Sequence, residues 1–229
     1  MIDLFGYLSA RPYPGRGILL GTRPDQTPVC AYFIMGRSVN SRNRVFETAE
    51  GGICTRAFDA AKLSDPSLIL YRPVRRLGDT LIVANGDQTD TIHACMARGG
   101  SVYEALSSRA FEPDAPYFTP RISGVAFPTG KYLLSILRAN GEEKPTCERF
   151  YFNFEPQAGA GHFISTYEGF GEPLPSFAGE PLSVSVPALS AAALAERLWN
   201  ALDRENRVSL YVLAGGEEAV VNKNGREAL

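Results

Sequence analysis

Short apolar runs separated by turn-forming residues recur along almost the whole chain, and this pattern constrains the fold more than any other feature. The runs are rich in Val, Ile, Leu, Tyr and Phe, with Gly, Pro, Asp and Asn between them, which is typical of β-strands. The predicted strands cover residues 17–21, 29–35, 67–74, 79–85, 121–127, 131–137, 147–154, 162–167, 208–213 and 218–222. The segment TRPDQTP, residues 22–28, is predicted to form the turn between the first two strands.

A helical region is predicted in the middle of the chain. Residues 87–99 are expected to form one helix and to run into a second short helix within residues 101–111. Ser101 and Glu104 have the spacing of a capping box at the start of the second helix.

A further helix is predicted within residues 190–206, with Ser190 as its N-cap. Leu194, Leu198 and Leu202 recur at four-residue intervals, which places them on one face of a helix. We interpret this face, which also carries Trp199, as core packing.

The order of elements is a block of strands, helices, a second block of strands, a helix and final strands. This order favours an α+β protein with mostly antiparallel sheets over a doubly wound parallel sheet. The chain has 229 residues, of which 45% are hydrophobic, so it can bury a single large core. The Pro- and Gly-rich residues 168–181 are predicted to be a long surface loop, and residues 1–229 to form one domain.

The sequence predicts a cytoplasmic protein. The first residues, MIDLFGYLSA, lack the basic start and apolar core of a signal peptide, and no apolar run reaches membrane-spanning length. The cysteines are scattered and form no CxxC pair, so we expect reduced thiols at Cys30, Cys54, Cys95 and Cys147.

Positive charge is concentrated near the start of the chain. Residues 1–44 hold six arginines, no lysine and two aspartates, a net charge of +4, whereas the whole chain is −2 and the remainder therefore −6. These arginines lie among Gly, Pro and Asn, in loop-like sequence, at positions 11, 16, 23, 37, 42 and 44. A pI near 5.8 argues against a general nucleic-acid binder, which leaves two interpretations of the local arginines open: they bind a small anionic ligand, or they form a solvated surface.

The residue inventory predicts no metal and no cofactor. The two histidines, His93 and His162, lie far apart, and His93 is interpreted as structural because it shares a helix face with Ile92 and Met96. No spacing of metal ligands, no GxSxG elbow, no GxGxxG and no Walker loop occurs. Arginine, tyrosine, asparagine and carboxylate remain, a set suited to binding an anion and stabilising charge on oxygen.

Five motifs occur in an order that resembles the archaeal-type IMP cyclohydrolase family. They are YPGRGI, SRNR, LYRPV, VANGDQTDTI and YFTPRI, and the resemblance covers roughly residues 13–125 and, more loosely, the remainder. The resemblance implies a four-layer αββα sandwich like that of the N-terminal-nucleophile hydrolases. It also implies closure of 5-formamidoimidazole-4-carboxamide ribonucleotide to inosine monophosphate (IMP) with loss of water, and a homo-oligomer.

The resemblance also implies roles for individual residues. The substrate-binding residues it implies are Arg16, Arg37, Asn43, Arg44 and Asn85. Tyr71 and Arg121 are implied at the reacting centre. Glu168 is a candidate base or partner of a ribose hydroxyl, with a solvated loop carboxylate as the alternative.

Structural interpretations compete with some of these roles. Asn85 could instead shape its own loop, and Asp87 or Asp90 is predicted to cap the helix that begins there. Tyr13 and Tyr32 are interpreted as core or wall aromatics.

The sequence also bears on the type of chemistry. An N-terminal nucleophile must be Ser, Thr or Cys, whereas Met1 is followed here by the bulky Ile2, so we expect a reaction without an enzyme nucleophile. Two alternatives stay open. One is a relative that hydrolyses an amide or cyclises another phosphoribosyl compound, and the other is a non-catalytic binder of purine nucleotides.

Overall fold

The computed structural model describes residues 1–62, 70–141, 145–171 and 174–225, and two antiparallel sheets dominate it. The six-stranded sheet has the order β11-β10-β1-β2-β12-β13. Its strands are β1 (Arg16–Thr22), β2 (Pro28–Met35), β10 (Ala160–Ser165), β11 (Leu182–Ser185), β12 (Arg207–Ala214) and β13 (Glu217–Asn222).

The seven-stranded sheet runs in chain order from β3 to β9. Its strands are β3 (Arg44–Ala49), β4 (Gly52–Ala57), β5 (Val74–Leu77), β6 (Thr80–Ala84), β7 (Arg121–Ala126), β8 (Tyr132–Asn140) and β9 (Thr146–Phe154). The helices are α1 (Leu4–Ser9), α2 (Val39–Arg42), α3 (Gln88–Ala97), α4 (Val102–Ser107) and α5 (Ala191–Ala201), with a 3₁₀ turn at Ala60–Lys62.

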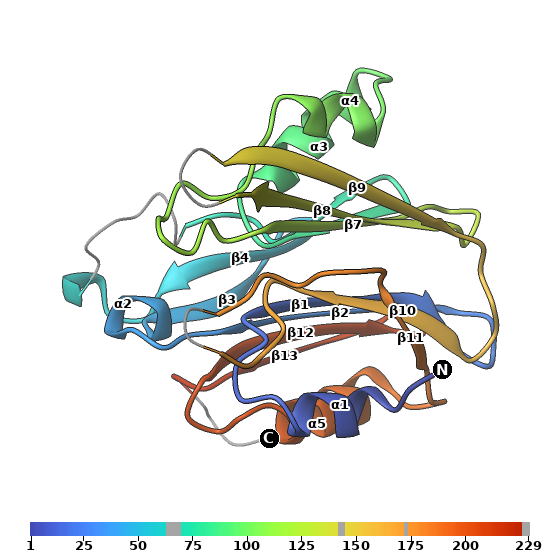
Figure 1. Ribbon diagram of the computed structural model, residues 1–229. Helices are drawn as coiled ribbons and strands as arrows, with labels where there is room; N and C mark the ends of the chain where they lie inside the picture. The colour runs from blue at the N-terminus through green and yellow to red at the C-terminus, as the bar shows by residue number, and fades with distance from the viewer. Residues whose placement is uncertain (63–69, 142–144, 172–173, 226–229) are drawn as a thin grey trace.

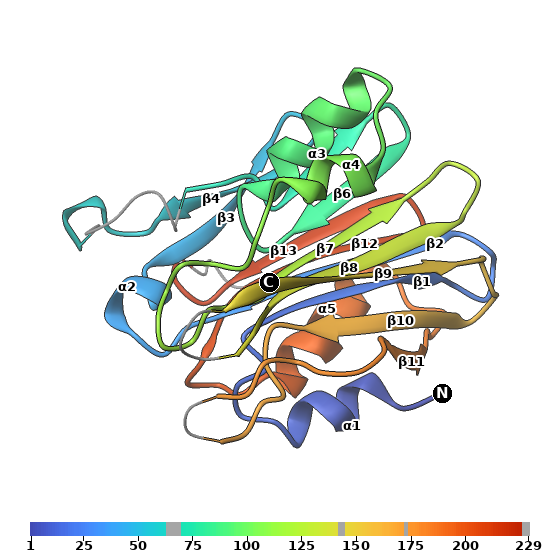
Figure 2. The ribbon, with the colours of Figure 1, turned by 45° about the horizontal axis from the view of Figure 1, so that its top comes forward.

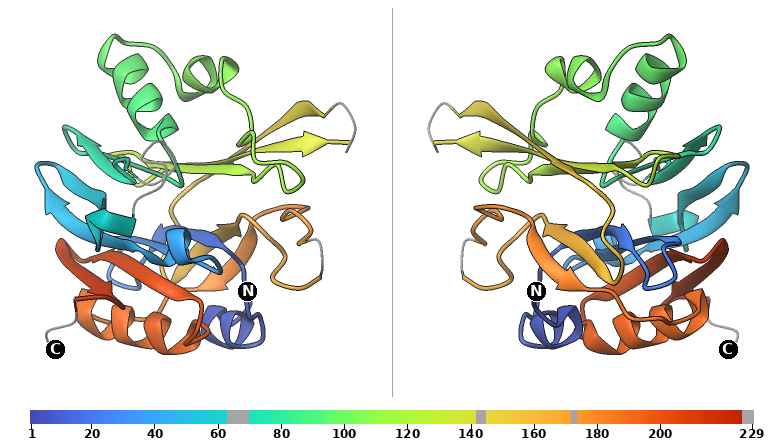
Figure 3. Two further views of the ribbon diagram at one scale, coloured as in Figure 1. Left: turned by 90° about the vertical axis from the view of Figure 1, so that its left-hand side faces the viewer. Right: turned by 90° about the vertical axis from the view of Figure 1, so that its right-hand side faces the viewer.

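The two sheets lie face to face, and helices cover the outer face of each (Figure 1). Helices α1 and α5 lie under the six-stranded sheet, while α3 and α4 lie over the seven-stranded sheet, as the two end views show (Figure 3). Figure 2 shows α3 and α4 from above, beside β6. Three buried apolar clusters fill the three interfaces between these layers. The predicted α+β class with mostly antiparallel sheets is confirmed.

Strand β1 shows how the sequence builds two of these interfaces. Successive side chains of a strand point to opposite faces, so Leu19 joins the cluster under the sheet, whereas Ile18 and Leu20 join the cluster between the sheets. A strand buried on both faces reads as a continuous apolar run, which is why GILLG was recognisable as a strand.

The helix predictions hold in their main features. Ser101 accepts a hydrogen bond from the Glu104 amide at 3.1 Å, and Ser190 accepts one from the Ala193 amide at 3.3 Å. The predicted face of the last helix is buried, with Leu194, Leu198, Trp199 and Leu202 at 1–2% exposure.

The capping prediction for the helix at residue 87 is wrong. Asp87 occupies the N-cap position of α3, but its side chain makes no capping hydrogen bond. Its carboxylate instead pairs with Arg109 and Arg121. Asp90 lies in the first turn of α3 and pairs with Arg75 at 2.6 Å. Arginines on neighbouring elements outcompete the helix end for both carboxylates.

The strand predictions fail mainly around residues 44–74. Residues 70–73 are not a strand, β5 begins only at Val74, and residues 67–69 lie outside the described part of the chain. Strands β3, β4 and β11 were not predicted, because RVFETA, GICTRA and LSVS mix charged or hydroxyl residues into short, partly exposed strands. Helices α1 and α2 were also missed.

Within the described ranges, no helix is long and apolar enough to cross a membrane. The four cysteines form no disulfide, and Cys30 and Cys95 are buried.

Candidate active site

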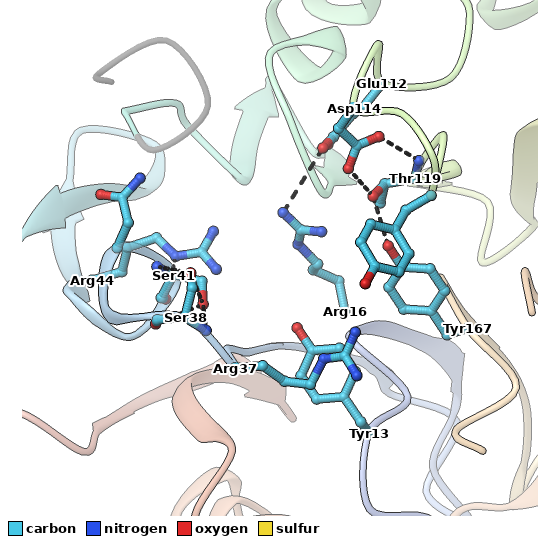
Figure 4. Close-up of a pocket in the computed structure, with 12 residues that line it drawn as sticks. Tyr13, Arg16, Arg37, Ser38, Ser41, Arg44, Glu112, Asp114, Thr119 and Tyr167 are labelled. Atoms are coloured by element: carbon cyan, nitrogen blue, oxygen red, sulfur yellow. Dashed lines mark hydrogen bonds and ion pairs between the residues drawn. The ribbon is translucent and has the colours of Figure 1, made fainter. Parts of the chain in front are cut away.

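A cavity of about 500 Å³ opens between the sheets (Figure 4). Ser41 of α2 is among its lining residues, and Figure 1 shows α2 at one end of the molecule. On the side of the six-stranded sheet the cavity is lined by Tyr13 and Arg16 at the start of β1, by the segment 37–41 after β2, and by Tyr167 after β10. On the other side Arg44 opens β3, and the loop 112–119 leads into β7. The lining of the cavity therefore comes from strand ends and loops of both sheets.

A second cavity, of about 510 Å³, lies at the opposite ends of β1 and β2. Arg76 and Asp79 are the charged residues of its lining, and Arg76 is already paired with Glu218 at 2.9 Å. The cavity beside Arg16 and Arg44 is the better candidate because three charged residues of its lining, Arg16, Arg44 and Glu112, have side chains that are largely withdrawn from solvent.

Gly15 sets the backbone of Arg16 at this cavity. It has a φ of +78°, and a Cβ at this position would lie 2.2 Å from the Thr166 hydroxyl. That hydroxyl accepts a hydrogen bond from the Arg16 amide at 3.1 Å. The glycine of YPGRG thus lets Thr166 approach, and the Arg16 N–H is occupied by the Thr166 hydroxyl.

Arg16 and Glu112 form a buried pair across the two sheets. Their side chains are 13% and 7% exposed, and Nη2 of Arg16 lies 4.0 Å from Oε2 of Glu112 (Figure 4). Burial alone would lower the pKa of Arg16, but the Glu112 carboxylate, followed by Tyr71, outweighs it, and the pKa lies above its ordinary range. Within the described residues, Nε of Arg16 is buried without a hydrogen-bond partner.

Glu112 is a buried acid with an altered proton affinity. Burial raises the pKa of its carboxyl above the ordinary value for glutamate, although Arg16 and Arg121 act in the opposite direction. Such a shift suits a group that both accepts and returns protons. Sequence analysis missed Glu112; the available signal was a carboxylate a few residues before the YFTPRI motif.

Arg44 brings a second buried cation to the cavity. Arg44 is 2% exposed, and its Nε donates a hydrogen bond to the Ser41 carbonyl oxygen at 2.9 Å. No carboxylate lies within 4.0 Å of its guanidinium in the described part of the chain. Burial, and then the positive charge of Arg16, lower the pKa of Arg44. Two buried cations with one carboxylate between them favour an anionic ligand.

Aromatic rings and a hydroxyl network form the remaining wall. The Arg37 guanidinium lies 4.9 Å from the centre of the Tyr13 ring, which stacks on Tyr167 at 6.1 Å. The Tyr167 hydroxyl lies 2.6 Å from the Thr119 hydroxyl, which in turn hydrogen-bonds Asp114. The interpretation of Tyr13 as a wall aromatic is confirmed.

Three of the eight predicted site residues line the cavity, namely Arg16, Arg37 and Arg44. The two asparagines do not. Asn43 donates to the carbonyl and accepts from the amide of Asp59, both at 2.8 Å. Asn85 donates to the Pro120 carbonyl and accepts from the Ile122 amide, both at 2.9 Å. The amide groups of both side chains hold loops in place.

Tyr71 lies just behind the cavity rather than in its lining. It is 7% exposed, and its hydroxyl lies 2.9 Å from that of the fully buried Tyr32. Tyr71 acts electrostatically on both arginines: after Glu112 it adds to the rise in the pKa of Arg16, and it only partly offsets the fall in the pKa of Arg44 that burial and Arg16 cause.

Arg121 and Glu168 are also outside the lining. The Arg121 side chain is 12% exposed and pairs with Asp87 at 2.8 Å. The Glu168 carboxylate accepts a hydrogen bond from the Ala178 amide at 2.8 Å.

The NGDQTD and PRI motifs form one hydrogen-bonded unit. Gln88 donates to Asn85 at 2.9 Å and accepts from Arg121 at 2.7 Å. Gly86 leaves room for the Arg121 guanidinium, since a Cβ at this position would lie 2.5 Å from Nη1 of Arg121. The unit fixes the start of β7, directly after the loop that carries Glu112.

Comparison with known proteins identifies the family. The family model described as IMP cyclohydrolase-like protein matches residues 13–218. The chain is 30% identical over 164 residues to a protein of Methanopyrus kandleri named IMP cyclohydrolase, an alignment that covers 70% of this chain and 77% of that protein. It is 32% identical over 155 residues to the IMP cyclohydrolase of Halobacterium salinarum strain NRC-1, covering 64% of this chain and 76% of the relative. The motifs, the extent of the family match and these identities agree, and the chain belongs to the IMP cyclohydrolase-like family.

Proposed function

We propose that this protein closes the ring of 5-formamidoimidazole-4-carboxamide ribonucleotide to give IMP and water. The observation that carries the proposal is the convergence of Arg16, Arg44 and Glu112 on one cavity in a chain of this family. The name of the relatives, IMP cyclohydrolase, gives the same activity that the motifs predict.

The reaction joins two groups of one molecule, so positioning supplies much of its acceleration. The carboxamide nitrogen must lie against the formyl carbon, and a well-oriented intramolecular pair gains on the order of 7–11 kcal/mol. Guanidinium groups from opposite sides of the cavity can hold the phosphate and the carbonyl oxygens at once. We assign Arg16, Arg37 and Arg44 to this binding.

A single carboxyl group can carry out the proton transfers that the reaction needs. The water that leaves takes its oxygen from the formyl group and both hydrogens from substrate nitrogens. In the first step the Glu112 carboxylate accepts a proton from the carboxamide nitrogen as the C–N bond forms, then passes it to the formyl oxygen. In the second step it takes another nitrogen proton and gives it to the departing hydroxyl. The raised pKa of Glu112 brings both protonation states closer in energy at neutral pH.

Cationic and hydroxyl groups stabilise the oxyanion that forms in the first step, before the formyl oxygen receives its proton. Arg16 and Arg44 supply positive charge in a buried site, where it acts more strongly than in water. Tyr71, next to both, is assigned as the hydroxyl donor. Arg121 adds a positive field at Glu112. We assign Asn43, Asn85 and Glu168 to holding their loops, since their side chains bind backbone groups.

Some broader predictions belong to the same proposal. We propose one domain over residues 1–229 and a fold of the N-terminal-nucleophile hydrolase type, supported by the two facing sheets with helices outside them. A homo-oligomer stays a prediction from the family resemblance, and a cytoplasmic location stays a prediction from the sequence.

Turnover of the named substrate tests the proposal. The purified protein is mixed with 5-formamidoimidazole-4-carboxamide ribonucleotide, and IMP formation is followed by ultraviolet absorbance and confirmed by mass spectrometry. We expect IMP at a rate far above the uncatalysed closure. Tight nucleotide binding without product would favour the non-catalytic binder, and product from a different phosphoribosyl compound alone would favour the diverged cyclase.

A further inference from the structure

Arg16 begins β1 of the six-stranded sheet, whereas Glu112 lies in a loop that leads into β7 of the seven-stranded sheet, so their separation depends on what holds this loop against the six-stranded sheet. Glu112 sits in the loop 112–119, between α4 and β7. Its backbone amide donates to the Thr119 carbonyl at 2.9 Å, so Thr119 fixes the position of Glu112 within the loop. Asp114 closes the same loop by accepting from the Thr119 amide at 2.6 Å.

Tyr167 connects this loop to the other sheet. The Thr119 hydroxyl gives its proton to Asp114, so it can only accept at its oxygen from a further hydroxyl. The Tyr167 hydroxyl, 2.6 Å away, is therefore the donor. The result is a directed chain from Tyr167 through Thr119 to Asp114 (Figure 4).

The backbone of Thr166 and Tyr167 is hydrogen-bonded to the backbone around Arg16. The Tyr167 amide donates to the Pro14 carbonyl at 3.2 Å, and the amide of the preceding Thr166 donates to the Arg16 carbonyl at 2.9 Å. The ring is 5% exposed and stacks on Tyr13. Tyr167 is thus rigidly attached to the strand end that carries Arg16.

We propose that Tyr167 is a positioning residue. Its hydroxyl holds the loop 112–119 against the six-stranded sheet, and so sets the distance between the Glu112 and Arg16 side chains and keeps water away from them. The catalytic part of this inference depends on the proposed function, and the positional part does not. Tyr167 acts on the reaction through Glu112.

The groups around Glu112 determine what a looser loop would do. Arg16 faces it from β1, Arg121 from β7 and Arg44 from β3, while Asp114 lies in its own loop. Burial is the largest cause of the raised pKa of Glu112. Without the Tyr167 hydroxyl, water reaches the carboxyl, and its pKa falls toward the ordinary value for glutamate.

The direct test is the titration of Glu112 in the protein labelled with ¹³C-glutamate, with the resonance assigned from Glu112→Gln. We expect Tyr167→Phe and Thr119→Val to lower the pKa of Glu112, and Thr119→Ser, which keeps the hydroxyl, to titrate like wild type. Tyr103→Phe is the matched control, because its hydroxyl joins α4 to β9 through Asn153 at 3.0 Å, outside the cavity. Coincident titration curves for wild type and Tyr167→Phe would overturn the inference.

Kinetics then test the route through Glu112. We expect Tyr167→Phe to lower kcat about tenfold, with KM changed less than about twofold, and to have no further effect on kcat in a Glu112→Gln background. An equal loss in both backgrounds would show that Tyr167 does not act through Glu112. If wild type forms no IMP, the proposed function fails while the titration still decides the positional part. An active wild type with an unshifted titration would refute the inference alone.

Discussion

The hydroxyl oxygens of Tyr32 and Tyr71 lie 2.9 Å apart between the two sheets, and either hydroxyl can donate in this hydrogen bond. Tyr32 is 0% exposed and Tyr71 is 7% exposed, so both residues are withdrawn from solvent. The role proposed for Tyr71 requires that Tyr32 donates, so that the proton of Tyr71 is available for an oxyanion near Arg16 and Arg44.

This direction of the hydrogen bond predicts that Tyr32, which does not line the cavity, affects catalysis. Tyr32→Phe should lower kcat roughly 5- to 10-fold, because Tyr71 loses the donor that directs its proton outward, while Tyr71→Phe should lower it further. KM should change little in either variant. Tyr132→Phe, which removes a buried hydroxyl bonded to His162 at 2.7 Å, serves as the control and should keep wild-type kcat. A Tyr32→Phe enzyme with unchanged steady-state kcat would argue against this role.

Two glutamates can be compared to locate the proton-transfer group. Glu112→Gln should reduce kcat roughly 100- to 10,000-fold, because the amide cannot shuttle a proton. Glu168→Gln should stay within about threefold of wild type, since its side chain binds the Ala178 amide and does not line the cavity. Steady-state assays of IMP formation separate the two. A severe loss in Glu168→Gln with an active Glu112→Gln would restore the role that the motifs had suggested for Glu168.

The raised pKa of Glu112 predicts the pH dependence of activity. The carboxylate is the form that starts the reaction, so kcat/KM should rise with pH through an apparent pKa above about 4.3, the ordinary value for glutamate. The residual activity of Glu112→Gln should lack this acidic limb. Rate profiles from acid to neutral pH measure it, and an unchanged limb in the variant would assign it to another group.

The same shift predicts how stability depends on pH. Between the ordinary pKa and the raised pKa, the folded state binds more protons than the unfolded state, so the free energy of unfolding must fall as pH rises. Glu112→Gln should lose this component of the slope, although its absolute stability should drop because Arg16 loses its counter-ion. Urea unfolding at several pH values gives the slopes. Equal slopes for both proteins would contradict a raised pKa at Glu112.

Replacing Arg44 should raise the stability of the protein and weaken substrate binding. It is a buried cation without a nearby carboxylate, so Arg44→Met should raise the free energy of unfolding by about 1–2 kcal/mol and raise KM roughly 10- to 100-fold. Arg42→Met is the control. Arg42 binds the Gly36 carbonyl at 2.9 Å and the Asn206 side chain at 3.1 Å, so this variant should be less stable and keep its KM. Chemical unfolding and steady-state kinetics test both, and a wild-type KM in Arg44→Met would remove Arg44 from the binding site.

Local patterns predicted those parts of the fold whose side chains are buried on a regular period. Strands such as β1 and β2 are apolar throughout, and the Leu194 and Leu198 repeat marks one face of α5. β3 and β4 were not predicted because they mix charged and hydroxyl residues with single apolar ones such as Phe46 and Ile53. Their strand conformation comes from pairing with each other and from packing on the facing sheet.

The sequence by itself determined the α+β class, the family and the need for arginines near the start of the chain. Only the tertiary structure decided which polar residues meet, because Arg16 and Glu112 are distant in the chain and become neighbours when two sheets pack face to face. It also separated residues that motifs group together: Arg44 lines the cavity, whereas Asn43, next to it, holds a loop. The direction of a side chain and the burial of a charge depend on the layers around them, and no local sequence pattern specifies those.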